Sequence, residues 1–277
     1  MGKDIIDRTS IRRFLLARRQ KDGGFSFAHE APATLEDTYF ALRIAHELEI
    51  SGMEDHAEDF LRSVKTRQVK QLYRLAHLAR THRMHTLWPE PETLTMALSR
   101  DLSRKKRIGP QTAYYRAKIL SIVEDPALKR SLRKQSFKNQ DAGIAGEEDL
   151  LSDLCYAAIA DRRQGILDDG MAMASMARRI KRFQGHDGGF SFTEKGAPSF
   201  LEETCLAVEA LVELGQRPEK EQACIRFVER CRAKNGGFGR QSTTVPTLES
   251  TYHAIRILKW LSDKEGATKG SEERRAG

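Results

Sequence analysis

The segment GGFSFTEKGAPSFLEETC, residues 188–205, contains the unit from which most of the chain is built. It consists of a glycine pair followed by phenylalanine, an irregular loop with a proline, and the start of an apolar helix. Two further copies are GGFSFAHEAPATLEDTY at residues 23–39 and GGFGRQSTTVPTLESTY at residues 236–252, and a divergent fourth runs from Ala142 to Cys155. Self-similarity of this kind indicates a repeat architecture.

Each part of the unit has a physical reason. The glycine pair suits a turn that needs positive φ or close backbone approach, and the phenylalanine can pack back onto the turn. A proline then ends any continuing helix, and a carboxylate or hydroxyl group starts the next one. The prolines of the three clear copies are Pro32, Pro198 and Pro246. The pattern predicts a helical hairpin in every repeat, with its first helix reaching the glycine pair.

Apolar residues at helical spacing place six such hairpins along the chain. The first four are predicted to begin their outer helices near residues 7, 54, 92 and 125, and their inner helices near residues 35, 70, 110 and 150. Hairpins five and six are predicted at about 170–215 and 219–262. The sequence therefore predicts an all-α fold, an (α/α)6 toroid, in one domain over residues 1–262, followed by a disordered polar tail at 263–277.

Composition narrows the functional classes. The 277 residues are 39% hydrophobic and 31% charged, which is typical of a soluble globular protein, and no apolar run of about 18 residues predicts a membrane span. The start of the chain has no signal-peptide pattern, so we expect a cytoplasmic protein with reduced cysteines. The net charge of +8 favours anionic partners. Basic and aromatic residues do not alternate as in RNA-binding proteins, so no nucleic-acid partner is expected.

In a toroid of this type, the first turns of the inner helices surround one central cavity. Alignment of the repeats puts six residues at one position of that turn: Tyr39, Tyr73, Tyr115, Cys155, Cys205 and Tyr252. The next position holds Phe40, Arg74, Arg116, Tyr156, Leu206 and His253. Apolar walls with a few polar groups are typical of a ligand cavity. The predicted substrate-binding residues are Arg74, Arg116, Tyr39, Tyr115, Tyr156 and Tyr252. Alternatively, the aromatic residues pack the centre and the arginines reach outward to solvent.

One pair of consecutive repeats suggests a metal site. Glu203 and Cys205 lie at the start of one inner helix, and His253 lies at the start of the next. A carboxylate, a thiolate and an imidazole can hold zinc and leave one position open, where an incoming thiol loses its proton. The alternative is that Glu203 is an ordinary helix-start residue and Cys205 a small buried apolar side chain.

Other chemistries have weaker signals. Asp153 and Cys155 form a rival pair, but Leu206 stands where the next repeat would need a histidine. The chain has no P-loop, no Gly-x-Ser-x-Gly elbow and no Cys-x-x-Cys pair. Acidic residues at the helix starts could serve glycoside hydrolysis, but their repetition indicates helix capping instead.

At these residues the chain resembles the prenyltransferase and squalene-cyclase repeat superfamily, most closely the β subunits of protein prenyltransferases. The resemblance is strongest over residues 8–50 and 170–262. It implies zinc bound by Glu203, Cys205 and His253 as the catalytic residues, and transfer of an isoprenoid from its diphosphate to a thiol. It also implies an acceptor peptide and an α-like partner subunit. A non-catalytic toroid that binds an isoprenoid or a partner protein is the competing interpretation.

The chain departs from the pattern that it resembles at three places. Glu203 replaces an aspartate, Leu206 replaces a tyrosine that contacts the diphosphate, and the basic Arg-x-x-Lys motif before the ligand pair is absent. Lys195 is the one cation in that loop, so Arg74, Arg116 or the cluster at residues 104–107 would have to hold the diphosphate instead. No Asp-x-Asp-Asp motif is present, so terpene cyclisation is not expected.

Overall fold

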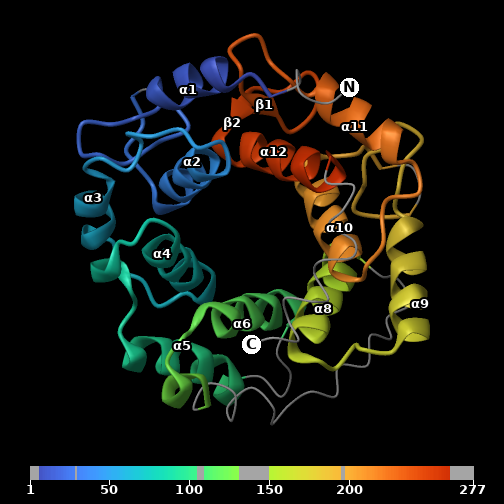
Figure 1. Cartoon of the computed structure of the whole chain (residues 1–277), viewed down its shortest axis with the longest axis horizontal. Helices are drawn as coiled ribbons and strands as arrows, with labels where there is room; N and C mark the ends of the chain where they lie inside the picture. The colour runs from blue at the N-terminus through green and yellow to red at the C-terminus, as the bar shows by residue number, and fades with distance from the viewer. Residues whose placement is uncertain (1–5, 29, 105–108, 131–149, 195–196, 263–277) are drawn as a thin grey trace. The chain divides into compact units, whose positions relative to one another are not determined.

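The computed structural model describes residues 6–28, 30–104, 109–130, 150–194 and 197–262 (Figure 1). The predicted tail and the turn of the divergent fourth copy lie outside these residues. The chain divides into two compact units. The N-terminal unit is Arg12–Glu147, and the C-terminal unit combines Met1–Ile11 with Glu148–Gly277. The single domain over residues 1–262 stays a prediction.

In the N-terminal unit, the second helices of successive hairpins form a row. Its elements are α1 (Arg8–Leu16, whose first residues belong to the other unit), α2 (Leu35–Glu47), α3 (Ala57–Ser63), α4 (Val69–Thr81), the 3-10 helix η1 (His85–Leu87), α5 (Pro91–Arg104) and α6 (Pro110–Ile122). Helix α2 packs on α4, and α4 packs on α6 (Figure 1). The buried faces of these helices carry aromatic and arginine side chains as well as aliphatic ones.

The C-terminal unit repeats this arrangement. Its elements are α8 (Leu151–Gln164), α9 (Gly170–Lys181), α10 (Leu201–Glu213), α11 (Glu221–Arg230), β1 (Phe238–Gly239), β2 (Pro246–Thr247) and α12 (Leu248–Ser262). Helix α10 packs between α8 and α12, while α9 packs on α8 and α10 and α11 packs on α12. Strands β1 and β2 pair antiparallel. The helices thus follow the predicted order, and the prediction of an all-α hairpin repeat is confirmed.

The three clear copies of the unit share one hydrogen-bonded turn. In the best copy the amide of Gly185 donates to the carbonyl of Gly189 at 2.8 Å, and Asp187 Oδ1 accepts from the amide of Gly189 at 3.1 Å. The turns at residues 20–24 and 233–237 make the same two bonds. Helix α9 ends at Lys181. The expectation that it reaches the glycine pair is wrong, because the residues before the glycines form this turn instead.

A buried phenylalanine and a threonine tie each turn to the helix that follows. Phe190 is fully buried, and its amide donates to Thr204 Oγ1 at 2.9 Å. The Thr204 hydroxyl in turn donates to the carbonyl of Phe200 at 2.7 Å. The pairs Phe25–Thr38 and Phe238–Thr251 repeat the first bond, both at 2.9 Å. The threonine beside the carboxylates at the helix start is therefore structural.

The first glycine of each glycine pair packs on the start of a neighbouring helix. Gly188 has φ +92°, and a Cβ atom there would lie 2.1 Å from the carbonyl carbon of Ala223 in α11. Gly236 meets the backbone of Ser10 in the same way, and Gly23 meets that of His56. Glycine is required because both the dihedral angle and the contact exclude a side chain.

Candidate functional site

The predicted zinc ligands all lie in the C-terminal unit. Glu203 is in the first turn of α10 and His253 is on α12, each partly buried. Cys205 is 6% exposed and belongs to an apolar core cluster with Cys224 and Phe227. Among the described residues, no group of three or more His, Cys, Asp or Glu side chains is placed to hold a metal ion. The three predicted ligands do not form such a group in this arrangement, and zinc binding by them stays a prediction.

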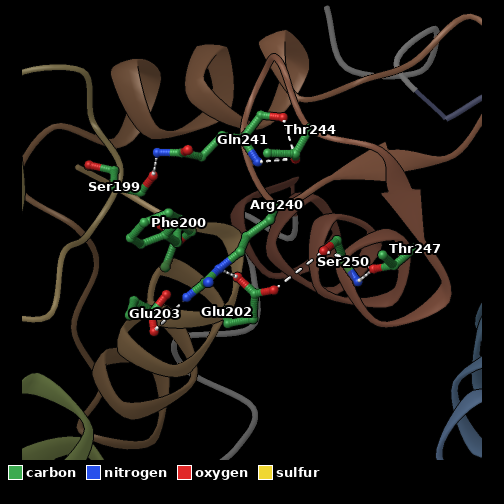
Figure 2. A network of polar contacts seen from close by, with 10 residues as sticks. Ser199, Phe200, Glu202, Glu203, Arg240, Gln241, Thr244, Thr247 and Ser250 are labelled. Carbon is green, nitrogen blue, oxygen red and sulfur yellow. Dashed lines mark hydrogen bonds and ion pairs between the residues drawn. The ribbon is translucent and has the colours of Figure 1, made fainter.

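Arg240, which sequence reasoning missed, lies beside the predicted ligand Glu203 (Figure 2). Its Nε donates to Glu202 Oε2 at 3.0 Å, and its Nη2 lies 3.8 Å from Glu203 Oε1. The guanidinium carbon is 4.0 Å from the centroid of the Phe200 ring, a cation–π geometry. The carbonyl of Arg240 also accepts a hydrogen bond from the amide of Leu201 at 3.1 Å, which fixes the loop against the start of α10.

The cation at this carboxylate pair therefore comes from the following repeat. The sequence places Lys195 in the loop before the pair, but this residue lies outside the described residues. The available signal was Arg240 itself, directly after the Gly-Gly-Phe-Gly of the third copy. Nothing in the spacing of a single repeat places it next to Glu202.

Glu203 is a largely buried carboxylate that does not cap its helix. Its side chain is 11% exposed, and Oε2 is buried without a hydrogen-bond partner. In α2, by contrast, Thr34 at the N-cap accepts from the amide of Asp37 at 3.0 Å and donates to its carboxylate. The N-cap of α10 is Phe200, which has no side-chain acceptor. Burial raises the pKa of Glu203. A hydrogen bond from its own backbone amide and the charge of Arg240 oppose this effect, and the charge of Glu202 adds to it.

This raised pKa gives a pH-dependent prediction. A carboxyl group with a pKa raised by folding stabilises the fold below its unfolded pKa, and that contribution is lost as the pH rises through the folded pKa. We expect Glu203→Gln to increase the free energy of unfolding by about 1 kcal/mol at pH 7, the lower end of the cost of an unsatisfied buried group. At pH 4 the gain should vanish. Urea unfolding at both pH values measures it.

The control for this prediction is Glu202→Gln. It relieves the repulsion on Glu203 but also removes the carboxylate that accepts from Arg240 Nε, so no net gain is expected at pH 7. A gain from Glu203→Gln that is the same at pH 4 and pH 7 would contradict the electrostatic explanation.

In the N-terminal unit, aromatic rings form a continuous row across three helices. The ring of His77 on α4 contacts those of Tyr39 on α2 and Tyr73 on α4, with centroids 6.0 and 5.5 Å apart. Tyr73 contacts Tyr115 on α6 at 5.7 Å, and Tyr115 contacts Tyr114 at 4.9 Å. Burial raises the pKa of Tyr39, so its phenol stays neutral.

Two arginines directly follow tyrosines of this row in the chain, Arg74 after Tyr73 and Arg116 after Tyr115. Arg74 and Arg116 are each 3% exposed, so the alternative that they reach outward to solvent is wrong. Arg74 forms an ion pair with Glu36 and donates to Gln71 Oε1 at 3.2 Å. Burial opposes ionisation of Glu36, but the hydrogen bond and charge of Arg74, with the charge of Lys70, hold its pKa below the usual range. The tyrosine–arginine row is defined here as Tyr39, Tyr73, Arg74, Tyr115 and Arg116.

The predicted substrate-binding residues are divided between the two units. Tyr39, Arg74, Tyr115 and Arg116 lie together on successive helices of the N-terminal unit. Tyr156 on α8 and Tyr252 on α12 are partly buried in the C-terminal unit, where the Tyr252 ring lies 5.8 Å from that of His253. The rival Cys155 is fully buried, and burial raises the pKa of its thiol.

A family model for the prenyltransferase alpha-alpha toroid domain matches residues 2–82, 113–199 and 199–272. The chain belongs to this family, and its all-α hairpin repeat is the repeat of an alpha-alpha toroid domain. No curated protein matches the sequence. Among the helices that the structure describes, none combines the length and the hydrophobicity that a membrane span requires.

Proposed function

We propose that the chain binds an isoprenoid diphosphate and transfers the isoprenoid group to a thiol. The observation that carries this proposal is the tyrosine–arginine row, buried except for the partly buried Tyr115, in a member of the prenyltransferase toroid family. Aromatic side chains form the kind of apolar wall that an isoprenoid chain needs. Guanidinium groups hold phosphate oxygens bidentately and keep their charge when buried.

The proposed reaction breaks one bond and forms one. The bond between the first carbon of the isoprenoid and the diphosphate oxygen breaks, and a carbon–sulfur bond forms as the thiol loses its proton. Diphosphate leaves with the electron pair, and Arg74 and Arg116 would stabilise its growing negative charge. Tyrosine faces would favour positive charge on the isoprenoid carbon. An acceptor peptide and an α-like partner subunit are part of the proposal, as is a cytoplasmic location.

Zinc at Glu203, Cys205 and His253 remains a prediction, and no step above depends on it. When bound, zinc would lower the pKa of the acceptor thiol. The second candidate is a non-catalytic toroid that binds an isoprenoid or a partner protein. The observation behind it is that Cys205 packs in the core while Arg240 lies beside Glu203.

Metal content and product formation distinguish these candidates. We expect protein purified under reducing, chelator-free conditions to contain about one zinc per chain. Cys205→Ala and His253→Ala should lose it, and Cys155→Ala should retain it. Farnesyl diphosphate and a cysteine peptide should yield a thioether and free diphosphate. If farnesyl diphosphate binds but neither zinc nor product is found, the non-catalytic candidate is favoured. If product forms without zinc, the zinc prediction is wrong and the transferase proposal stands.

A further inference from the structure

The second repeat lacks the glycine–phenylalanine turn, and a cavity lies beside the short segment that replaces the turn. Only the short segment Val64–Gln68 joins α3 to α4. Leu72 stands at the helix position that Thr38 occupies in α2, so no threonine is present to tie down a turn phenylalanine. The cavity has a volume of approximately 680 Å³ and lies between the end of α3, this segment, α4, η1 and the residues that follow η1.

The lining of this cavity is apolar at its base and cationic at its edge. Leu72 and Leu75 are buried, and Trp88 is partly buried beside them. Lys65 and Arg67 are exposed at the edge, against one lining carboxylate, Glu90. Within the part of the chain that the structure describes, the side chains of Lys65 and Arg67 form no hydrogen bond or ion pair.

A third lining cation is already neutralised. Arg62 Nη2 pairs with Glu58 Oε1 at 3.0 Å, and Arg62 Nε donates to Thr86 at 3.2 Å. The positive charge that a ligand would meet is therefore that of Lys65 and Arg67. Ligand pockets commonly measure about 300–1,000 Å³, so this cavity is large enough for a whole small molecule.

We propose that this cavity is a binding site for a single-chain amphipathic anion. Its apolar chain would lie against Leu72, Leu75 and Trp88, and its carboxylate or phosphate head group would pair with Lys65 and Arg67. The site goes beyond the proposed transferase function, because none of its lining residues belongs to the tyrosine–arginine row. A ligand of this type matches both the apolar base and the unbalanced positive edge.

Tryptophan fluorescence tests the proposal directly, because Trp88 and Trp260 are the two tryptophans of the chain. Trp260→Phe leaves Trp88 as the single emitter at the cavity. We expect dodecyl phosphate or dodecanoate, added below its micelle concentration, to change this emission saturably. Dodecanol should bind at least about tenfold more weakly, or 1.4 kcal/mol. Whichever of the two anions binds more tightly shows whether the site prefers a phosphate or a carboxylate head group. With Trp88→Phe instead, the emission of Trp260 should not change.

Reversing the charge of the two cations at the cavity edge is the second test of the proposal. Lys65→Glu with Arg67→Glu should weaken anion binding at least about tenfold in the Trp260→Phe chain. The matched control is Arg12→Glu with Lys21→Glu, two exposed cations of the same unit away from the cavity, which should have little effect. Both double variants should unfold cooperatively in urea.

Three results would overturn the proposal. One is the absence of any Trp88 response to either anion, and another is equal affinity for dodecanol. The third is a response lost in Arg116→Ala but kept in the Lys65/Arg67 variant, which would place the probe in the tyrosine–arginine row. Failure here leaves the transferase proposal standing, because thioether formation is measured separately.

Discussion

Replacing Gly188 with alanine is expected to lower the free energy of unfolding by about 3 kcal/mol or more. A Cβ atom at this position would lie 2.1 Å from the carbonyl carbon of Ala223, which is backbone and cannot rotate away. The dihedral angle of +92° adds the cost of a left-handed conformation for a non-glycine residue. The contact between Gly188 and Ala223 joins two successive hairpins, so separating these residues should also weaken the packing of one hairpin on the next. Urea unfolding followed by circular dichroism measures the change.

Gly215→Ala is the matched control. Gly215 also has a positive φ, +69°, but an added Cβ would meet nothing within 4 Å. Only the conformational cost of about 1–2 kcal/mol should remain. Equal losses at both positions would contradict the steric part of the prediction and leave only the conformational cost of positive φ.

The second large effect concerns the two buried arginines. Arg74→Ala and Arg116→Ala are each expected to weaken farnesyl diphosphate binding by about 1.5–3 kcal/mol, the range for hydrogen bonds to charged groups. Binding of farnesol, which lacks the phosphates, should barely change. Isothermal titration measures both affinities. Arg74→Met and Arg116→Met should repeat the result, because they keep much of the buried aliphatic stem and reduce any effect of an empty cavity.

The ion pair of Arg74 with Glu36 sharpens this test. Glu36→Gln removes the negative charge that competes for the guanidinium, so it should tighten diphosphate binding when Arg74 is present. The same substitution in an Arg74→Ala chain should have no such effect. Equal losses of diphosphate and farnesol in the arginine variants would show that the arginines shape the packing instead. Unchanged diphosphate affinity would remove both arginines from the site.

The local structure was predictable because it depends on residues close together in the chain. Positive φ at Gly188, the buried Phe190 and the helix start at Leu201 follow from backbone sterics, proline and apolar spacing within one copy of the repeat. The same reasoning placed the ends of α1, α9 and α11 too late, because the hydrogen bonds of each turn begin earlier than the glycine pair. The order of the hairpins and the all-α class followed from repeating that local pattern.

The chemistry at the helix starts depended instead on which repeats pack together. The sequence suggested that Glu203, Cys205 and His253 share one ion, because they fall at matching positions of neighbouring repeats. In the tertiary structure Cys205 packs in the apolar core cluster and Arg240 lies beside Glu202, 38 residues earlier in the chain, and the shared ion stays a prediction. Side-chain partners at that separation are set by the contact of one helix face with the next, which spacing within a repeat does not encode.

The sequence by itself therefore determined the repeat, its turns, the order of its helices and the positions where aromatic and cationic side chains stand. The tertiary structure decided that Arg74 and Arg116 are buried and that Glu203 holds a carboxylate oxygen without a hydrogen-bond partner. It also decided that a cavity lies beside the second repeat, which lacks the turn phenylalanine of the three clear copies. The reason is that burial and voids are properties of several packed elements together, whereas turns and helices are fixed by the backbone of one.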